Sequence, residues 1–156
     1  MNTTVLAAAT ELGRVDIGEV AGGVLGTLAY FVVGLLVLSG GFLVLDVLTP
    51  GNLRHQVYVD KNPNAAIILG ANHLALAIVV VTAIWTSSDG FAQGLVDSAV
   101  YGLVGVILQA IALAGMNLVL PGRLVELVGE TKMCGAAWAV GTTLVAIGLV
   151  NAAALS

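Results

Sequence analysis

Four long apolar segments constrain the fold of this sequence more than any other feature. They cover about residues 20–48, 64–86, 95–120 and 135–155. Each is as long as the roughly 20 apolar residues that an α-helix needs to cross the hydrocarbon core of a bilayer. The chain is 59% hydrophobic and 9% charged, so it has few polar residues with which to cover a soluble core. The sequence therefore predicts an integral membrane protein with four spans in a lipid bilayer.

The spans are expected to be helices. Backbone N–H and C=O groups in lipid must be bonded within the protein, which only helices and closed barrels achieve. The segments lack the alternating pattern of barrel strands. The predicted fold class is therefore all-α, and residues 1–19 are expected to form a retained, extracytoplasmic tail.

The sequence also repeats itself at a constant offset of 71 positions, so that residue 30 falls on residue 101 and residue 85 on residue 156. Common apolar letters coincide by chance, so the rare residues carry the argument. We interpret residues 20–89 and 90–156 as two tandem, parallel copies of a two-helix unit joined by a Pro-Gly loop. The rare coincidences are Pro50 with Pro121, Gly51 with Gly122, and Lys61 with Lys132, the only two lysines.

The few positive charges predict the orientation. Arg54 and Lys61 lie between the first two spans, and Arg123 and Lys132 lie between the last two. The positive-inside rule places both of these loops in the cytoplasm and both termini outside. Arg14 alone disagrees, and acidic residues surround it. Since each copy has two spans, the copies share one orientation and are expected to be related by a pseudo-two-fold axis along the membrane normal.

Both loops between paired spans contain Pro-Gly. Proline ends an apolar helix, and Pro-Gly suits a tight turn, although Thr49-Pro50 also fits the cap and first turn of a new helix. A short interfacial helix is expected after each Pro-Gly, and Asn62-Pro63 fits the start of the second long helix. We favour a structural role for the loop motif over ligand binding. Its residues are Thr49, Pro50, Gly51, Pro121 and Gly122.

The unit resembles a known family. A helix that ends in Asp46-Val-Leu-Thr-Pro-Gly-Asn-Leu53, followed by an Asn64-Ala-Ala66 start, looks like the bacterial transmembrane family called domain of unknown function 350, a UPF0719-type membrane protein. The resemblance covers roughly residues 20–156. In the second copy Asn117 and Leu120 replace the acid and the threonine. The resemblance implies a multi-pass inner-membrane protein with no established biochemical activity.

Polar residues within the spans are candidates for function, because they are costly in lipid. Asp46, near the end of the first span, either reaches headgroup water, pairs with Arg54 or Lys61, or forms a polar mouth with Asn117. His73 lies about 13 Å along the second span, and Gln109 comes to a similar depth. The two side chains are expected either to bond to each other or to line a proton or ion pathway.

Paired small residues indicate close helix packing. Ala66-x-x-x-Gly70 recurs as Ala137-x-x-x-Gly141, which predicts equivalent interfaces on the second and fourth spans.

The sequence shows no enzyme or nucleic-acid signature. It has no Cys-x-x-Cys, His-Glu-x-x-His or phosphate-binding Gly-Lys-Ser/Thr motif, and Cys134 is solitary. The net charge is −4 with no basic stripe, which argues against nucleic-acid binding. We therefore expect no enzymatic activity, no cofactor and no metal.

Two functional hypotheses remain. The first is an oligomeric conduit for an ion or small cation, lined by Asp46, His73, Gln109 and Asn117. The second is a membrane scaffold or envelope-stress component that docks a cytoplasmic protein through its Pro-Gly loops. In the scaffold, Arg54, Lys61, Arg123 and Lys132 provide the cytoplasmic contacts. A homo-oligomer is expected because a four-helix chain is small for a pore.

Overall fold

The computed structural model describes residues 16–48, 53–88, 90–119 and 124–155, and every regular element in these ranges is a helix. Four are long enough and apolar enough to cross a membrane, as the sequence predicted. One six-residue helix lies between the two members of each pair, where short helices were expected. The elements are α2 (Ile17–Leu48), α3 (Leu53–Tyr58), α4 (Pro63–Trp85), α5 (Phe91–Val119), α6 (Leu124–Gly129) and α7 (Gly135–Leu155).

Side-chain caps explain where two of the long helices begin. The Asp16 carboxylate accepts a hydrogen bond of 2.8 Å from the Gly18 N–H, so α2 starts slightly before the expected residue 20. At α4 the Asn62 carboxamide oxygen accepts from the N–H groups of Asn64 at 2.9 Å and Ala65 at 3.2 Å. Pro63 occupies the first turn, where its missing N–H costs nothing. The expected Asn62-Pro63 start is confirmed.

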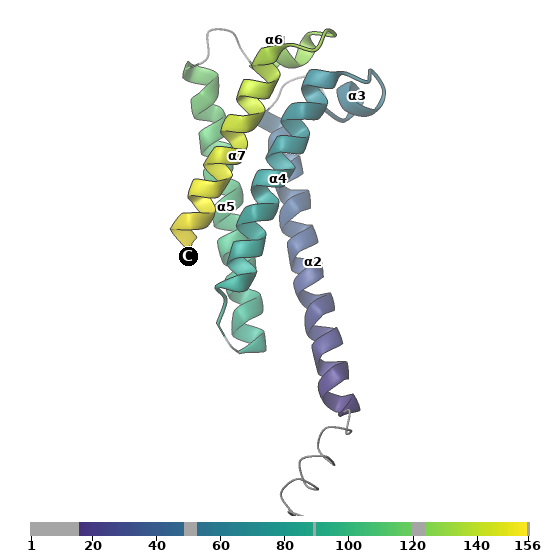
Figure 1. Ribbon diagram of the computed structural model, residues 1–156, viewed down its shortest axis with the longest axis vertical. Coiled ribbons are helices and arrows are strands. Elements are labelled where there is room, and N and C mark those ends of the chain that lie inside the picture. The colour runs from purple at the N-terminus through teal and green to yellow at the C-terminus, as the bar shows by residue number, and fades with distance from the viewer. Residues whose placement is uncertain (1–15, 49–52, 89, 120–123, 156) are drawn as a thin grey trace, which may run out of the picture.

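The long helices run up and down, and α3 and α6 lie together at one end of the bundle, here named the α3–α6 end (Figure 1). α4 packs on α2, α5 and α7, and its contact with α7 is the most extensive in the molecule. α5 also contacts both α2 and α7. The central pair α4 and α5 therefore separates α2 on one side from α7 on the other (Figure 1).

This arrangement departs from the expected pseudo-two-fold symmetry. A two-fold axis would exchange α2 with α5 and α4 with α7, so α2 and α7 would pack together as α4 and α5 do. No comparable contact joins α2 to α7 within the described residues. The two units do share one orientation, because α3 and α6 lie at the same end (Figure 1).

Glycines of α7 bring it close to α4. A Cβ atom added at Gly148 would lie 2.6 Å from the Cβ and 2.7 Å from the Cα of Ala75. One added at Gly141 would lie 3.2 Å from the Cβ of Ala71. Gly70, which the repeat pairs with Gly141, is exposed and would have no atom within 4 Å of such a Cβ. The expectation of equivalent interfaces is therefore wrong, because α4 presents alanines to α7 and turns Gly70 outward.

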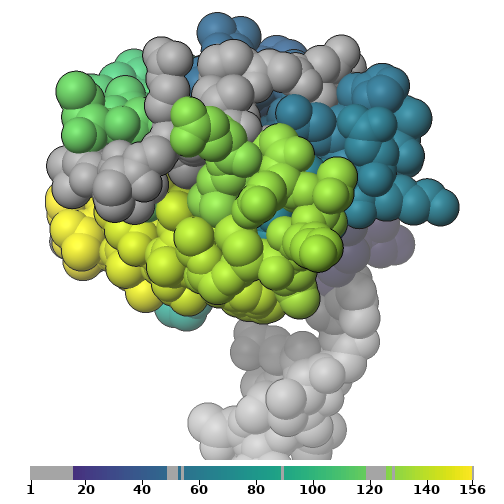
Figure 2. Space-filling view, turned by 90° about the horizontal axis from the view of Figure 1, so that it is seen from above, coloured from purple at the N-terminus to yellow at the C-terminus, as the bar shows by residue number. Residues whose placement is uncertain are grey.

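A cluster of buried apolar side chains lies toward the α3–α6 end. Leu53 of α3 is fully buried there against Leu45, Ile68 and Leu144. Figure 2 looks onto this end and shows α6 and the start of α7, in yellow-green, next to α3, in blue-teal. By contrast, α2 exposes many large apolar side chains, such as Leu25 and Leu36, each 66% exposed. A surface of this kind suits contact with lipid chains.

Candidate functional site

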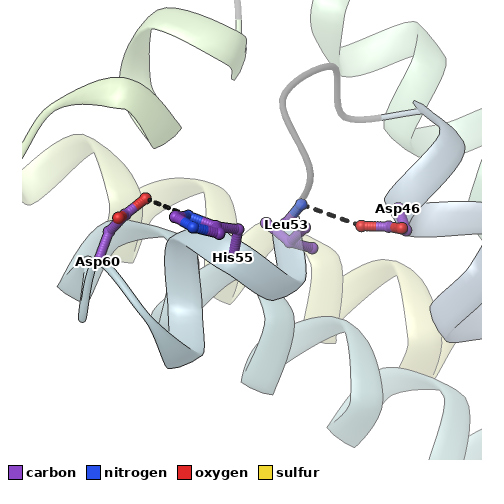
Figure 3. Close-up of polar contacts among 4 residues, drawn as sticks. All are labelled: Asp46, Leu53, His55 and Asp60. Carbon is purple, nitrogen blue, oxygen red and sulfur yellow. Dashed lines mark hydrogen bonds and ion pairs between the residues drawn. The ribbon is translucent and has the colours of Figure 1, made fainter.

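The side chain of Asp46, near the end of α2, forms a hydrogen bond with the first residue of α3. Its carboxylate oxygen Oδ1 accepts a hydrogen bond of 3.0 Å from the backbone N–H of Leu53 (Figure 3). The first N–H groups of a helix have no partner within that helix, so this bond satisfies one of them and fixes where α3 begins. Asp46 thus has a structural partner other than the Lys61 that the sequence suggested. The side chain of Arg54 lies outside the described residues.

The short connection from α3 to α4 has its own polar contact. His55 Nδ1 lies 3.1 Å from a carboxylate oxygen of Asp60, and both side chains are exposed (Figure 3). Lys61 follows with a positive φ of 53°, and the N–H of Asn62 donates to the C=O of Gln56 at 2.9 Å. This main-chain bond and the left-handed backbone of Lys61 turn the chain from α3 into the start of α4.

His73 lies in a surface groove between α2 and α4. Its Nδ1 is 2.9 Å from the carbonyl oxygen of Leu69, one turn earlier in the same helix. Its ring is tilted by 46° against that of Phe42, with 5.8 Å between centroids. The groove has a volume of about 500 Å³ and also contains Ser39 and Tyr58. Within the described residues, Nε2 of His73 has no partner.

Gln109 lies elsewhere, in the interior of the bundle. It is 3% exposed, and its Nε2 donates to the carbonyl oxygen of Leu144 at 3.1 Å. The predicted bond between Gln109 and His73 is therefore wrong. The two residues have similar depths, but His73 faces the groove beside α2 while Gln109 reaches across to α7. The Oε1 atom of Gln109 is buried without a hydrogen-bond partner.

Three further predicted site residues, Asn117, Lys61 and Lys132, lie at the α3–α6 end. Asn117 is half-buried in the last turn of α5 and is already engaged in an interaction. Lys61 and Lys132 are exposed. The loop motif Thr49, Pro50, Gly51, Pro121 and Gly122, together with Arg123, lies outside the described residues.

Asn64 is a polar centre that sequence reasoning did not assign to a site. It is fully buried, and its Nδ2 donates to the carbonyl oxygens of Glu130 at 2.9 Å and Lys132 at 2.8 Å. Its Oδ1 accepts from the N–H of Cys134 at 3.0 Å. One side chain at the start of α4 thus holds the segment between α6 and α7. The signal was available, because Asn64 belongs to the motif that carried the family resemblance.

Asn151 is a second residue that the sequence reasoning missed. It is 5% exposed on α7, and its Nδ2 donates to the carbonyl oxygen of Gly105 on α5 at 3.2 Å. Gln109 donates in the opposite direction, from α5 to the main chain of α7. The two carboxamides therefore join the same pair of helices by reciprocal bonds. A lone asparagine in an otherwise apolar span was the available signal.

No group of three or more His, Cys, Asp or Glu side chains that could hold a metal ion occurs among the described residues. Cys134 is half-buried, with its thiol free. The four proposed pathway residues are thus distributed over the α2–α3 junction, a surface groove, the bundle interior and the end of α5. They do not line one continuous route within a single chain.

Comparison with known sequences places this architecture in a family. Residues 19–155, nearly the whole described bundle, match the family described as Domain of Unknown Function (DUF350). The chain belongs to the DUF350 family. The resemblance drawn from Asp46–Leu53 and Asn64–Ala66 is therefore confirmed.

Similar proteins extend the match over almost the whole length. A "UPF0719 transmembrane protein" of Mycolicibacterium paratuberculosis is 47% identical over 148 residues, which cover 95% of this chain and 98% of the relative. A UPF0719 transmembrane protein of Mycobacterium bovis is 42% identical over 149 residues, or 96% of this chain and 98% of the relative. No solved structure matches. This DUF350 chain is therefore a multi-pass bacterial transmembrane protein.

Proposed function

We propose that the protein is a non-enzymatic, oligomeric conduit for an ion or small cation in the bacterial inner membrane. The α3–α6 end would face the cytoplasm and both termini the outside, since that end carries Lys61 and Lys132. We also interpret the chain as a duplication. The two short helices support this. α6 (Leu124–Gly129) begins 71 positions after the start of α3 (Leu53–Tyr58) and ends 71 positions after its end.

The observation that carries the proposal is the surface groove with His73. Its Nε2 has no partner within the described part of the chain, and Ser39 and Tyr58 line the same groove. Polar side chains within a membrane face a neighbour or a hydrated cavity, because contact with lipid chains is costly. A second copy placed against α2 and α4 would enclose these three polar groups together with the apolar side chains around them. The conduit is therefore proposed to lie between chains. Inside each chain, Asp46 holds the start of α3 and Gln109 joins α5 to α7.

Ion flux into liposomes that contain the purified protein tests the proposal. His73→Leu is expected to abolish flux while the protein stays folded, because it removes the polar imidazole from the groove. Thr82→Val is the matched control on the same helix, since its hydroxyl only donates to the Ile78 carbonyl of its own helix at 3.0 Å. Flux that is unchanged in His73→Leu would contradict the conduit.

A scaffold that docks a cytoplasmic protein is the second candidate, and the contacts of Asn64 favour it. They hold the segment before α7 in place, so exposed charges such as Lys61, Glu130 and Lys132 are presented on a fixed surface. The charge reversals Lys61→Glu and Lys132→Glu should then impair the protein in cells more than His73→Leu does. Equal or smaller effects of the reversals would count against the scaffold.

A further inference from the structure

α2, α4 and α5 line a small, partly open cavity, separate from the groove with His73. Its volume is about 10 Å³, which is about the space that one water molecule requires. Gly41, Leu76 and Val106 line it and lie close together, since a Cβ atom on Gly41 would collide with the Leu76 side chain. Among the residues that line the cavity, only Asn72 and Gln109 have polar side chains.

Gln109, one of the residues that line the cavity, keeps an unused hydrogen-bond acceptor. Its Nε2 donates to the Leu144 carbonyl oxygen, and Oε1 is buried with no protein partner among the described residues. Exchanging the two atoms would place two oxygens against each other, so the amide orientation is fixed. An acceptor left unsatisfied in a protein interior destabilises the fold, and in lipid no bulk water can relieve it.

Asn72 supplies the second polar group. It is 3% exposed on α4 and lines the same cavity. Its carboxamide has no hydrogen-bond partner within the described ranges. Two nearly buried carboxamides from different helices thus meet one cavity, and each keeps hydrogen-bonding capacity that no protein group uses.

We propose that this cavity binds a single water molecule that bridges Asn72 of α4 and Gln109 of α5. The water donates one hydrogen to Oε1 of Gln109 and bonds to the Asn72 carboxamide, so both groups are satisfied without a direct contact. A cation does not fit, because no charged side chain lines the cavity and a Ca²⁺ ion, for example, takes about six to eight oxygen ligands. The inference is independent of the conduit, because the cavity and the groove with His73 have no lining residue in common.

Water-edited solid-state NMR of the full chain in lipid bilayers tests this site. Magnetisation is expected to pass from water to the side-chain amides of both Asn72 and Gln109. Asn72→Leu fills the cavity and removes one partner, so the transfer to Gln109 should be lost. Leu74→Val is the matched control, because Leu74 is exposed on the same helix, and it should leave the transfer unchanged.

Two results would overturn the proposal. One is the absence of transfer to either amide in the unaltered protein, which would show a dry cavity. The other is transfer to Gln109 that persists in Asn72→Leu. Should Asn72→Leu not fold, Asn72→Ser keeps a polar group and leaves more room, and the Gln109 transfer must then survive.

Discussion

Asn64 combines full burial with three hydrogen bonds to main-chain groups of Glu130, Lys132 and Cys134. Each such bond contributes about 0.5–1.5 kcal/mol, and stranded buried groups add to the loss. Asn64→Ala should therefore lower the free energy of unfolding by about 3 kcal/mol, measured by denaturant titration in micelles. Amide hydrogen exchange should also accelerate at residues 130–134. Thr142→Val, which removes an exposed hydroxyl bonded within its own helix, should change stability little; equal losses in both variants would contradict this role.

Lys61 has a left-handed backbone, with φ of 53°. That conformation costs a residue with a Cβ atom about 1 kcal/mol, whereas glycine adopts it freely. Lys61→Gly should therefore raise the free energy of unfolding by up to about 1 kcal/mol. Lys132→Gly is the control, because Lys132 is exposed and does not have a positive φ. A destabilised Lys61→Gly in thermal unfolding would show that the lysine side chain contributes more than its backbone costs.

Counting along a helix predicted the depth of polar residues but not their direction. His73 and Gln109 are at similar depths, yet they bond to Leu69 and Leu144. The direction depends on how each helix is rotated against its neighbours. These helices are apolar on nearly all faces, so the sequence does not show which face is turned toward the other helices. Asn64 and Asn151 were missed for a related reason, since their partners are main-chain carbonyls, and these leave no mark in a sequence.

At the scale of the elements, α4 and α7 form the most extensive helix contact, and Gly148 determines how closely they approach. Gly148→Ala would place a methyl group 2.6 Å from the Cβ of Ala75, so the helices must separate. The expected loss is about 1–3 kcal/mol. Gly70→Ala is the matched control on α4, where the added methyl group meets no atom within 4 Å and the better helix propensity should add up to about 1 kcal/mol. Thermal unfolding that ranks the two variants in the opposite order would contradict this packing.

The sequence predicted the elements well, because length, proline and caps are local properties. The last long helix was expected at 135–155 and is found at Gly135–Leu155, and α4 differs from its expected bounds by one residue at each end. The start of α5 was placed four residues late. A polar residue and a glycine just before residue 95 are typical of a loop, although here they belong to the first turn of the helix. Which helices meet could not be predicted, since lipid-facing and core-facing residues are equally apolar in these spans.

For the whole molecule, the unsymmetrical packing matters for assembly. α4 and α5 occupy the centre and α2 lies at one side, so the groove between α2 and α4 faces outward and carries Ser39 and His73. The repeat predicted a two-fold bundle that would have treated both units alike. The groove that combines His73 and Ser39 with apolar side chains instead gives each chain a distinctive surface on the α2 side. Chains that associate through such a surface build a closed ring or a dimer, depending on the rotation between copies.

Disulfide crosslinking in native membranes tests this mode of assembly. In a Cys134→Ser background, Ser39→Cys should give oligomers on mild oxidation, because Ser39 is exposed at the groove that copies are proposed to share. Val150→Cys is the matched control, since Val150 is 71% exposed on α7, away from that groove. Crosslinks from Ser39→Cys alone would support assembly around the His73 groove. Crosslinks from Val150→Cys alone would place the interface on α7 and leave His73 toward lipid, which would remove the structural basis of the conduit.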